Sequence, residues 1–425
     1  MKAMDKVMMF ANKMGNNPYL QAISRGLMAT LPINILGSIS LLLAVLPIDL
    51  WSNFLNTIGL TPYLFTTFSL TVGIIAVYGA FFIGYQLAKN LGQAALPGGL
   101  VSLFTFLLMT PMVASEAGGM TLDSSRLGAQ GIFTAIIAGL IFTKIYCIIL
   151  DKKIVIKMPD GVPPFVSETF AGLLPVILTS IIAIIVARLF GATTWGSFAD
   201  FINAIVATPL QGLSSHVGSL LFIVLVQMLL WFFGIHGSMV VGPFVAALFL
   251  PMDLANMDAL AAGYANSDFP NIMGQTFYNI FSGIGGAGGT LSLIIVILIF
   301  AKSKQNRAVG KLATVPGMFT INEPMVFGLP LLLNPIMAVP FILTPLVQTG
   351  IAYLGIASGL FPRLSGVAVP FGTPIFVNGF IAGGWSIPIL QLICVAAGCL
   401  LYYPFLKVLD KQKVKEESET TEVAA

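Results

Sequence analysis

The chain has 425 residues, of which 57% are hydrophobic and only 9% are charged. Soluble domains carry about 25% charged residues, so 20 Lys and Arg with 17 Asp and Glu cannot cover the surface of a soluble protein of this length. The composition indicates an integral membrane protein and excludes soluble enzymes, nucleic-acid-binding proteins and disordered scaffolds. The formal net charge of +3 is too small to indicate an anionic partner, so the basic residues are informative through their positions.

The first half of the chain predicts one surface helix and five membrane-spanning helices. Residues 4–20 are amphipathic and contain no cleavable signal sequence, so we expect them on the cytoplasmic membrane surface. A span needs about 20 predominantly apolar residues, and five segments meet this requirement: 23–47, 64–88, 97–115, 129–150 and 170–190. Basic residues flank this set at both ends, whereas loop 48–63 contains no Lys or Arg. The positive-inside rule therefore predicts a cytoplasmic N-terminus.

The second half is less regular, and its interruptions are informative. Residues 191–215 predict an amphipathic helix at the outer interface, and 216–250 predict two short crossings broken near His236. Glycine-rich and proline-rich stretches further on are too apolar for solvent loops and too irregular for lipid-facing helices. We therefore expect an outer loop at 251–268, re-entrant segments at 269–289 and 361–382, a basic cytoplasmic loop at 302–311, a broken element at 316–330, and crossings at 291–301, 331–360 and 385–406.

These segments add up to ten crossings with both termini in the cytoplasm. The predicted fold is an all-α integral membrane protein with re-entrant hairpins and amphipathic interfacial helices. We expect a five-helix scaffold over 1–190, a transport domain over 191–406, and a disordered cytoplasmic tail over 407–425. Discontinuous helices near the membrane midplane are where transporters bind their cargo, so the broken helices assign substrate binding to the second part.

Two ionisable residues in the broken segments are candidates for chemistry, because charge inside a membrane segment is costly and usually functional. Glu323 lies between Asn322 and Pro324, where its carboxylate can bind a hydroxyl-rich ligand or cap backbone N–H groups. His236 lies at the predicted helix break, where the imidazole can exchange hydrogen bonds or a proton with a ligand. The alternative for His236 is a satisfied core side chain.

Aromatic and amide side chains complete the candidate site. Trp231 and Trp385 can pack against the C–H faces of a sugar ring, or they can belong to the interfacial aromatic belt. Four asparagines in broken segments would provide hydrogen bonds to a carbohydrate: Asn271, Asn279, Asn322 and Asn378. The three cysteines lack Cys-x-x-Cys spacing and the chain has only two histidines, so we expect no metal ion and no cofactor.

Three motifs occur in order in the second half, at Trp231–Gly237, Ile321–Pro324 and Phe371–Pro374. Together they resemble the membrane (IIC) subunit of the bacterial phosphotransferase system, in its lactose/cellobiose/diacetylchitobiose branch. The resemblance extends over nearly the whole chain, including the amphipathic start and the basic segment before the Asn-Glu-Pro element.

The resemblance implies a permease in the bacterial cell membrane that takes up a β-linked disaccharide of the cellobiose or diacetylchitobiose type. It implies a homodimer whose interface is formed by the first five helices. The sugar 6-hydroxyl would be phosphorylated by a separate cytoplasmic IIB subunit that carries a phosphocysteine and is served by IIA. His236 and Glu323 would line the sugar site near that hydroxyl as the catalytic pair, while no residue of this chain would itself be phosphorylated.

An ion-coupled sugar symporter, with Glu323 as the proton site, is the alternative function that the residues leave open. It would transport sugar in vesicles that have an ion gradient but lack phosphotransferase proteins. A channel or a lipid-handling scaffold would need a pore-lining charge pattern or a lipid-facing groove, and the sequence shows neither.

The alternation of basic and non-basic loops gives a topology that labelling can check. Cysteines introduced at Asp49 and at Lys153 should react with membrane-impermeant reagents from opposite sides of the membrane, because an odd number of predicted spans separates them. Labelling of both positions from the same side would contradict the predicted arrangement.

Overall fold

The computed structural model describes residues 16–46, 48–114, 119–159, 161–162, 164–329, 331–370 and 372–424. The surface helix expected over 4–20 lies mostly outside these residues. Most of the described residues are helical and the described strands form one short antiparallel pair, which confirms the all-α membrane class. The chain divides into two compact units, one with residues 16–213 and Ala246–Leu254, the other with Ser214–Val245 and residues 255–424.

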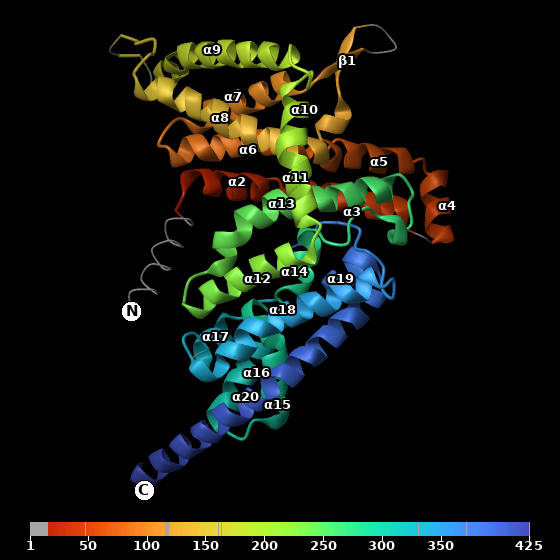
Figure 1. Ribbon diagram of the computed structural model, residues 1–425, viewed down its shortest axis with the longest axis vertical. Coiled ribbons are helices and arrows are strands. Elements are labelled where there is room, and N and C mark those ends of the chain that lie inside the picture. Colours follow the sequence, from red (N-terminus) through yellow and green to blue (C-terminus); the bar gives the residue numbers. More distant parts are fainter. Residues whose placement is uncertain are drawn as a thin grey trace. The chain divides into compact units, whose positions relative to one another are not determined.

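The first unit consists of consecutive helices joined by short connections. Asn17 begins the first of them, because its side chain accepts hydrogen bonds from the N–H groups of Tyr19 and Leu20 at 2.9 and 3.1 Å. The helices are α2 (Pro18–Ala29), α3 (Leu31–Val45), α4 (Asp49–Thr57), α5 (Thr61–Ser69), α6 (Ile75–Asn90), α7 (Ala95–Met109), α8 (Ile132–Asp151), α9 (Pro164–Gly191), α10 (Phe198–Ile202) and α11 (Thr208–Ser214) (Figure 1).

Small residues allow helices α6, α7 and α8 to pack closely together. A Cβ atom on Gly84 of α6 would lie 2.2 Å from the Cβ atom of Ser102 on α7, so a larger residue would force these helices apart. The buried hydroxyl of Ser102 donates to the Ala80 carbonyl at 2.5 Å. Close approach of backbones is a common basis of helix association in lipid, because burying apolar side chains gains little there.

The expected span 97–115 is wrong at its C-terminal end. Helix α7 stops at Met109, and strand β1 (Met112–Ala114) pairs antiparallel with β2 (Met120–Leu122). Thr110 has extended backbone, with φ −80° and ψ 131°. The residue before a proline disfavours the helical conformation, so Pro111 explains why the helix ends here.

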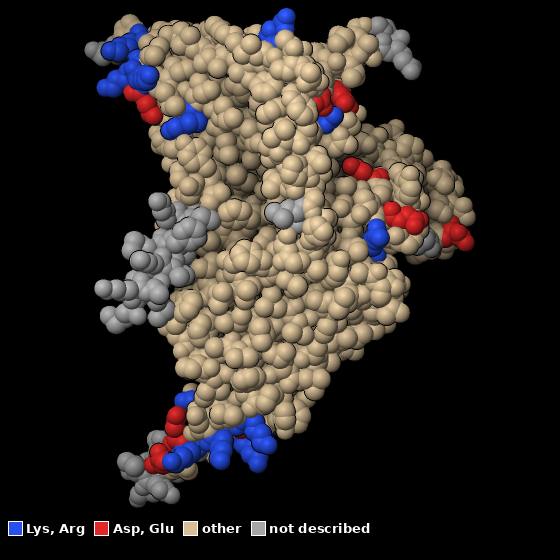
Figure 2. Space-filling model, in the orientation of Figure 1, with Lys and Arg blue, Asp and Glu red and all other residues tan. Residues whose placement is uncertain are grey.

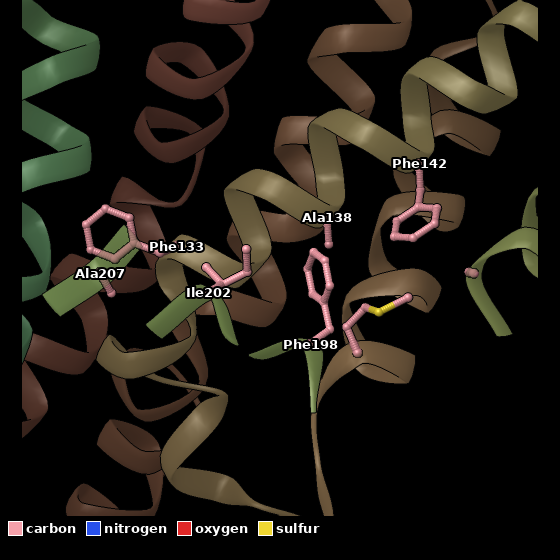
Figure 3. Close-up of a cluster of buried hydrophobic side chains, with 8 residues drawn as sticks. Phe133, Ala138, Phe142, Phe198, Ile202 and Ala207 are labelled. Carbon is pink, nitrogen blue, oxygen red and sulfur yellow. The ribbon is translucent and has the colours of Figure 1, made fainter. Parts of the chain in front are cut away.

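The segment expected as an amphipathic helix over 191–215 is helical from Phe198 to Ser214, with one π-helical turn between α10 and α11. Its apolar side belongs to a buried cluster, in which Phe198 lies beside Ala138 of α8 (Figure 3). An ion pair from Arg126 Nη2 to Asp200 Oδ1, at 2.6 Å, fixes its start. These contacts explain why a segment rich in polar positions is ordered.

The second unit contains both helix breaks expected from the sequence, near His236 and within 316–330. Helix α18 packs against α12 and α20, and α15 packs against α16 and α20 (Figure 1). The helices are α12 (Val217–Phe232), α13 (Gly237–Ala261), α14 (Gln275–Phe281), α15 (Thr290–Phe300), α16 (Lys304–Met318), α17 (Glu323–Gly328), α18 (Pro335–Ala357), α19 (Val377–Gly383) and α20 (Ser386–Ala424). The middle of α13 groups with the first unit.

The expected outer loop at 251–268 is wrong, because helix α13 continues through it to Ala261. Asn256 is buried in this part of the helix. Its side-chain amide donates to the carbonyls of Asn271 and Leu364, at 2.8 and 2.9 Å. The polar residue therefore faces the protein interior, where it joins three segments.

The basic loop expected at 302–311 is wrong, because most of it is helical, and the segment expected as a disordered tail over 407–425 is described as helix as far as Ala424. Helix α16 begins at Lys304, and α20 runs without interruption from Ser386 to Ala424 (Figure 1). Carboxylates on α20 bind the N–H groups that are left without partners at the start of α16. Each helix end therefore stabilises the other.

Asp410 and Glu417 of α20 provide these carboxylates. Asp410 accepts hydrogen bonds from the backbone N–H groups of Lys302 and Ser303, at 2.7 and 3.1 Å. Glu417 accepts from the next two N–H groups, at 3.1 and 2.9 Å. Negative charge at a helix N-terminus is favourable because the peptide dipoles point their positive ends there.

Seven helices in the described part of the chain are long and apolar enough to cross a membrane, or eight if one bent pair counts as a span. The bent pair is Phe198–Gly212 with Val217–Phe232. Two shorter apolar helices, Ala95–Met109 and Ala287–Phe300, occupy further expected crossings. A multi-pass membrane protein is confirmed, while the number of ten crossings stays a prediction.

Replacement of Asp410 by Asn should destabilise the contact between α20 and α16. The amide removes the negative charge from a buried group that accepts two backbone hydrogen bonds, so we expect a loss of about 2 kcal/mol and a lower apparent melting temperature of the purified protein. Glu416→Gln is the matched control, since Glu416 is exposed and forms an ion pair with Lys413 of the same helix. Equal melting temperatures of D410N and E416Q would contradict the capping role.

Candidate functional site

The break between α12 and α13 brings two candidate residues together. The rings of Trp231 and His236 are in contact, with centroids 4.3 Å apart and planes tilted by 48°. Trp231 is half-buried at the end of α12, while His236 is exposed and precedes the first residue of α13. The His236 carbonyl accepts from the Met239 N–H at 3.0 Å, so the backbone here is held by the start of α13 and the imidazole stays accessible.

A polar network fixes the indole of Trp231. Its Nε1 donates to Ser238 Oγ at 3.3 Å, and Gln227 Nε2 donates to the same oxygen at 2.9 Å. The Tyr278 hydroxyl of α14 donates to Gln227 Oε1 at 2.5 Å. Sequence reasoning missed Gln227, Ser238 and Tyr278, although a glutamine inside an otherwise apolar span is a recognisable signal.

The second break, between α16 and α17, is attached to the glycine-rich loop that precedes α15. The buried Asn322 side chain donates from Nδ2 to the Ala287 carbonyl at 2.8 Å. Gly286 has φ +96°, and a Cβ atom there would lie 2.5 Å from Asn322 Cγ. Only glycine allows both this backbone conformation and this close approach, which explains part of the glycine content of the loop.

The same loop is attached to the first break. The Gly288 N–H lies 3.3 Å from Met228 Sδ on α12, one helical turn before Trp231. The Tyr402 hydroxyl of α20 donates to the Gly288 carbonyl at 2.6 Å. The loop therefore connects the helix that ends beside His236 with the residue that precedes Glu323.

Glu323 is the first residue of α17, and its side chain is exposed. The carbonyl of Asn322 accepts the N–H groups of Met325 and Val326, at 3.0 and 2.9 Å. No hydrogen bond to the Glu323 carboxylate comes from the parts of the chain that the structure describes. This arrangement favours a carboxylate that is available to a ligand over one that caps the helix.

The third motif approaches the second break. The N–H of Ile375 donates to the carbonyl of Met318, the last residue of α16, at 2.8 Å. Phe371 lies outside the described residues, so the geometry of this motif is known only from residue 372 onward.

The remaining candidates are placed differently from this group. Asn279 is exposed on α14, Asn271 is fixed through its backbone by Asn256, and the Asn378 side chain accepts from buried Gln391. The contacts given for Asn271 and Asn378 do not involve the glycine-rich loop. The predicted roles of all three asparagines stay predictions.

Trp385 is 81% exposed and contacts only the ring of Phe380 among the described aromatic residues. It lies immediately before the first residue of α20 and precedes Tyr402 by seventeen positions, or roughly 25 Å at 1.5 Å per residue. Asn322 contacts the glycine-rich loop directly and Glu323 follows it in the chain, while Trp231 follows Met228, which also contacts the loop, by one turn. Trp385 lies far along the chain from the contact that Tyr402 makes with the loop.

Comparison with known proteins supplies independent information. Residues 24–345 match the family "Phosphotransferase system, EIIC". The "Lichenan permease IIC component" of Bacillus subtilis (strain 168) is 37% identical, covering 98% of this chain and 94% of that protein. The "PTS system cellobiose-specific EIIC component" of Geobacillus stearothermophilus is 34% identical, covering 97% and 94%. A crystal structure of ChbC, the IIC component of the N,N'-diacetylchitobiose-specific phosphotransferase system, has a TM-score of 0.92 at 36% identity, covering 98% of this chain and 99% of that one.

The position of Trp231 predicts a measurable role in ligand binding. Trp231→Ala should lower the affinity for the disaccharide expected from the sequence about tenfold, because a preoriented indole provides a large apolar face for the sugar ring. Trp385→Ala, measured in parallel by isothermal titration calorimetry, should cause a smaller loss. If neither variant changes the affinity, both tryptophans belong to the interfacial belt.

Proposed function

Because this chain belongs to the EIIC family of the phosphotransferase system, we propose that it takes up a β-linked disaccharide and presents the sugar 6-hydroxyl to a IIB component for phosphorylation. Members of this family are multi-pass membrane proteins that act on a sugar together with IIB and IIA components. The substrate type, the hydroxyl and the residues that handle it are parts of the proposal.

The substrate class is supported by the names of the similar proteins, which refer to lichenan, cellobiose and N,N'-diacetylchitobiose. These names share a β-linked, glucose-type unit, and the chain aligns with each of the three proteins over nearly its full length. A disaccharide of the cellobiose or diacetylchitobiose type is therefore the proposed substrate.

One observation carries the proposed site: two separate helix breaks are attached to the same loop. The break with Trp231 and His236 is linked to it through Met228, and the break with Glu323 through Asn322. An aromatic face, an imidazole and a carboxylate are the groups that a sugar needs for stacking and for hydrogen bonds from its hydroxyls. The exposure of His236 and Glu323 supports their availability to such a ligand.

The proposed reaction transfers a phosphoryl group from the IIB phosphocysteine to the sugar. The oxygen of the 6-hydroxyl forms a bond to phosphorus, the S–P bond breaks, and the cysteine leaves as thiolate. The hydroxyl proton passes to a base, for which Glu323 or His236 is the proposed acceptor. Catalysis of phosphoryl transfer rests mainly on positioning and electrostatic stabilisation, so these residues would orient the hydroxyl toward the donor.

Phosphorylation also gives uptake its direction. The product carries a phosphate charge, and a charged sugar returns poorly through a site without compensating basic residues. Because the phosphoryl donor supplies the free energy, transport against a sugar gradient requires no coupled ion. We further propose a homodimer with residues 1–190 at the interface, and both termini in the cytoplasm.

Glu323→Gln tests the proposed site most directly. The amide keeps the shape of the side chain but loses the charge, so sugar affinity or IIB-dependent phosphorylation should fall about ten- to hundredfold. Binding is measured by calorimetry and phosphorylation by phosphate transfer from phosphoenolpyruvate in vesicles supplied with the other components.

Glu416→Gln is the control, since it removes one exposed carboxylate far along α20. Normal binding and phosphorylation in E323Q would make Glu323 a structural residue. Uptake that collapses with an ionophore while phosphoenolpyruvate is abundant would contradict the proposed mechanism as a whole.

A further inference from the structure

A cavity of about 440 Å³ lies at the polar end of α20, away from the candidate sugar site. Its lining combines three lysines and one aspartate with two aromatic rings and two aliphatic side chains: Lys302, Lys407, Lys411, Asp410, Phe300, Tyr403, Leu406 and Val414. The rings of Phe300 and Tyr403 are 4.8 Å apart in an edge-to-face contact. Figure 2 shows Lys and Arg side chains, together with some acidic ones, gathered at this end of the second unit, beside a surface of uncharged residues.

The three lysines of this cavity form no ion pair among the described residues, and they outnumber the one carboxylate that lines it. The ion pairs found among the described residues of α20 join Lys413 to Glu416 and Lys415 to Glu419, and they involve none of the three. Asp410 also lines the cavity, but its oxygens are occupied by the N–H groups at the start of α16 and by the Asn306 side chain. The cavity therefore presents a net positive charge.

An apolar surface leads directly to this charge. On α20, Leu400, Tyr403, Lys407 and Lys411 follow one another at intervals of three or four residues, so they lie along one face of the helix. Leu400 is 78% exposed, and Ile299 near the end of α15 is 64% exposed. Exposed apolar side chains on membrane-spanning helices face the lipid chains. Lys407 and Lys411 come after this apolar part of α20 in the chain.

The spacing along α20 matches the structure of a lipid monolayer. Lys407 lies one turn beyond Tyr403, about 6 Å along the axis, and Lys411 about 12 Å beyond it. The headgroup layer is about 5–8 Å thick on each side of the hydrocarbon core, and lysine side chains extend toward it from either depth. Tyr403 takes the position of an interfacial aromatic residue.

We propose that this cavity binds the phosphate headgroup of an anionic phospholipid, whose acyl chains lie along the exposed Leu400 and Ile299. Lys302, Lys407 and Lys411 contact the phosphodiester, and the rings of Phe300 and Tyr403 contact the glycerol and the first methylene groups. A basic pocket between helices at the membrane surface is a typical lipid headgroup site. A soluble anion would leave the apolar part of the lining uncovered.

The experiment measures phospholipid binding to the full-length purified protein by native mass spectrometry. Detergent-solubilised protein is titrated with phosphatidylglycerol, with phosphatidylcholine and with inorganic phosphate. Wild type should bind phosphatidylglycerol at least tenfold more tightly than phosphatidylcholine, and inorganic phosphate should not compete. The triple variant K302Q/K407Q/K411Q should lose this preference, since each lysine near a membrane surface contributes about fivefold.

The triple variant K304Q/K413Q/K415Q is the matched control, because it removes the same charge from neighbouring positions on α16 and α20 that do not line the cavity. It should bind phosphatidylglycerol as wild type does, and equal elution profiles verify that both variants fold. Equal lipid retention in all three proteins would overturn the proposal. Competition by inorganic phosphate would reveal a free-anion site, and loss of IIB-dependent phosphorylation with unchanged lipid binding would reveal a protein docking surface.

Discussion

The buried hydrogen bond from the Asn322 amide to the Ala287 carbonyl is the constraint on which the arrangement of the second unit depends. It joins two interruptions of regular structure that are 35 residues apart in the chain, and it does so across Gly286, where no side chain fits. This contact adds to the packing of α15 against α16 in fixing the residue that starts α17 relative to the loop before α15. The orientation of Glu323 therefore depends on an amide and a glycine that need not contact substrate themselves.

Irregular backbone at membrane depth is tolerated only if its polar groups are satisfied, and the loop before α15 meets this requirement with side chains from several helices. Tyr402 donates to the Gly288 carbonyl and Thr290 to the Gly285 carbonyl, both at 2.6 Å. The sulfur of Met228 faces the Gly288 N–H. Because these partners come from α12, α15 and α20, the loop can form only when the surrounding helices are packed.

Much of the helical framework could be predicted from the sequence, because apolar length and basic flanks are local properties. The breaks at His236 and before Glu323 were also predictable, since glycine and proline interrupt helices wherever they occur in such patterns. The helical C-terminal part of α20 could not be predicted, because its polar composition is typical of a disordered tail. Its side chains contact N–H groups that lie more than 100 residues earlier in the chain. The outer loop expected at 251–268 was wrong for a similar reason, because Asn256 in this segment has hydrogen-bond partners in distant parts of the chain. For the site, residue type identified Trp231, His236 and Glu323, but only tertiary structure separates them from Trp385.

The hydrogen bonds between the carboxylates of α20 and the start of α16 have a mechanical consequence. Asp410 and Glu417 hold the first turn of α16, and the last residue of that helix lies four positions before Asn322. A helix is stiff along its axis, so α16 forms a rigid connection between the polar end of α20 and the Asn-Glu-Pro element. Any force applied to the far end of α20, by a bound protein or by the membrane surface, is transmitted over the length of α16 to the backbone that carries Glu323.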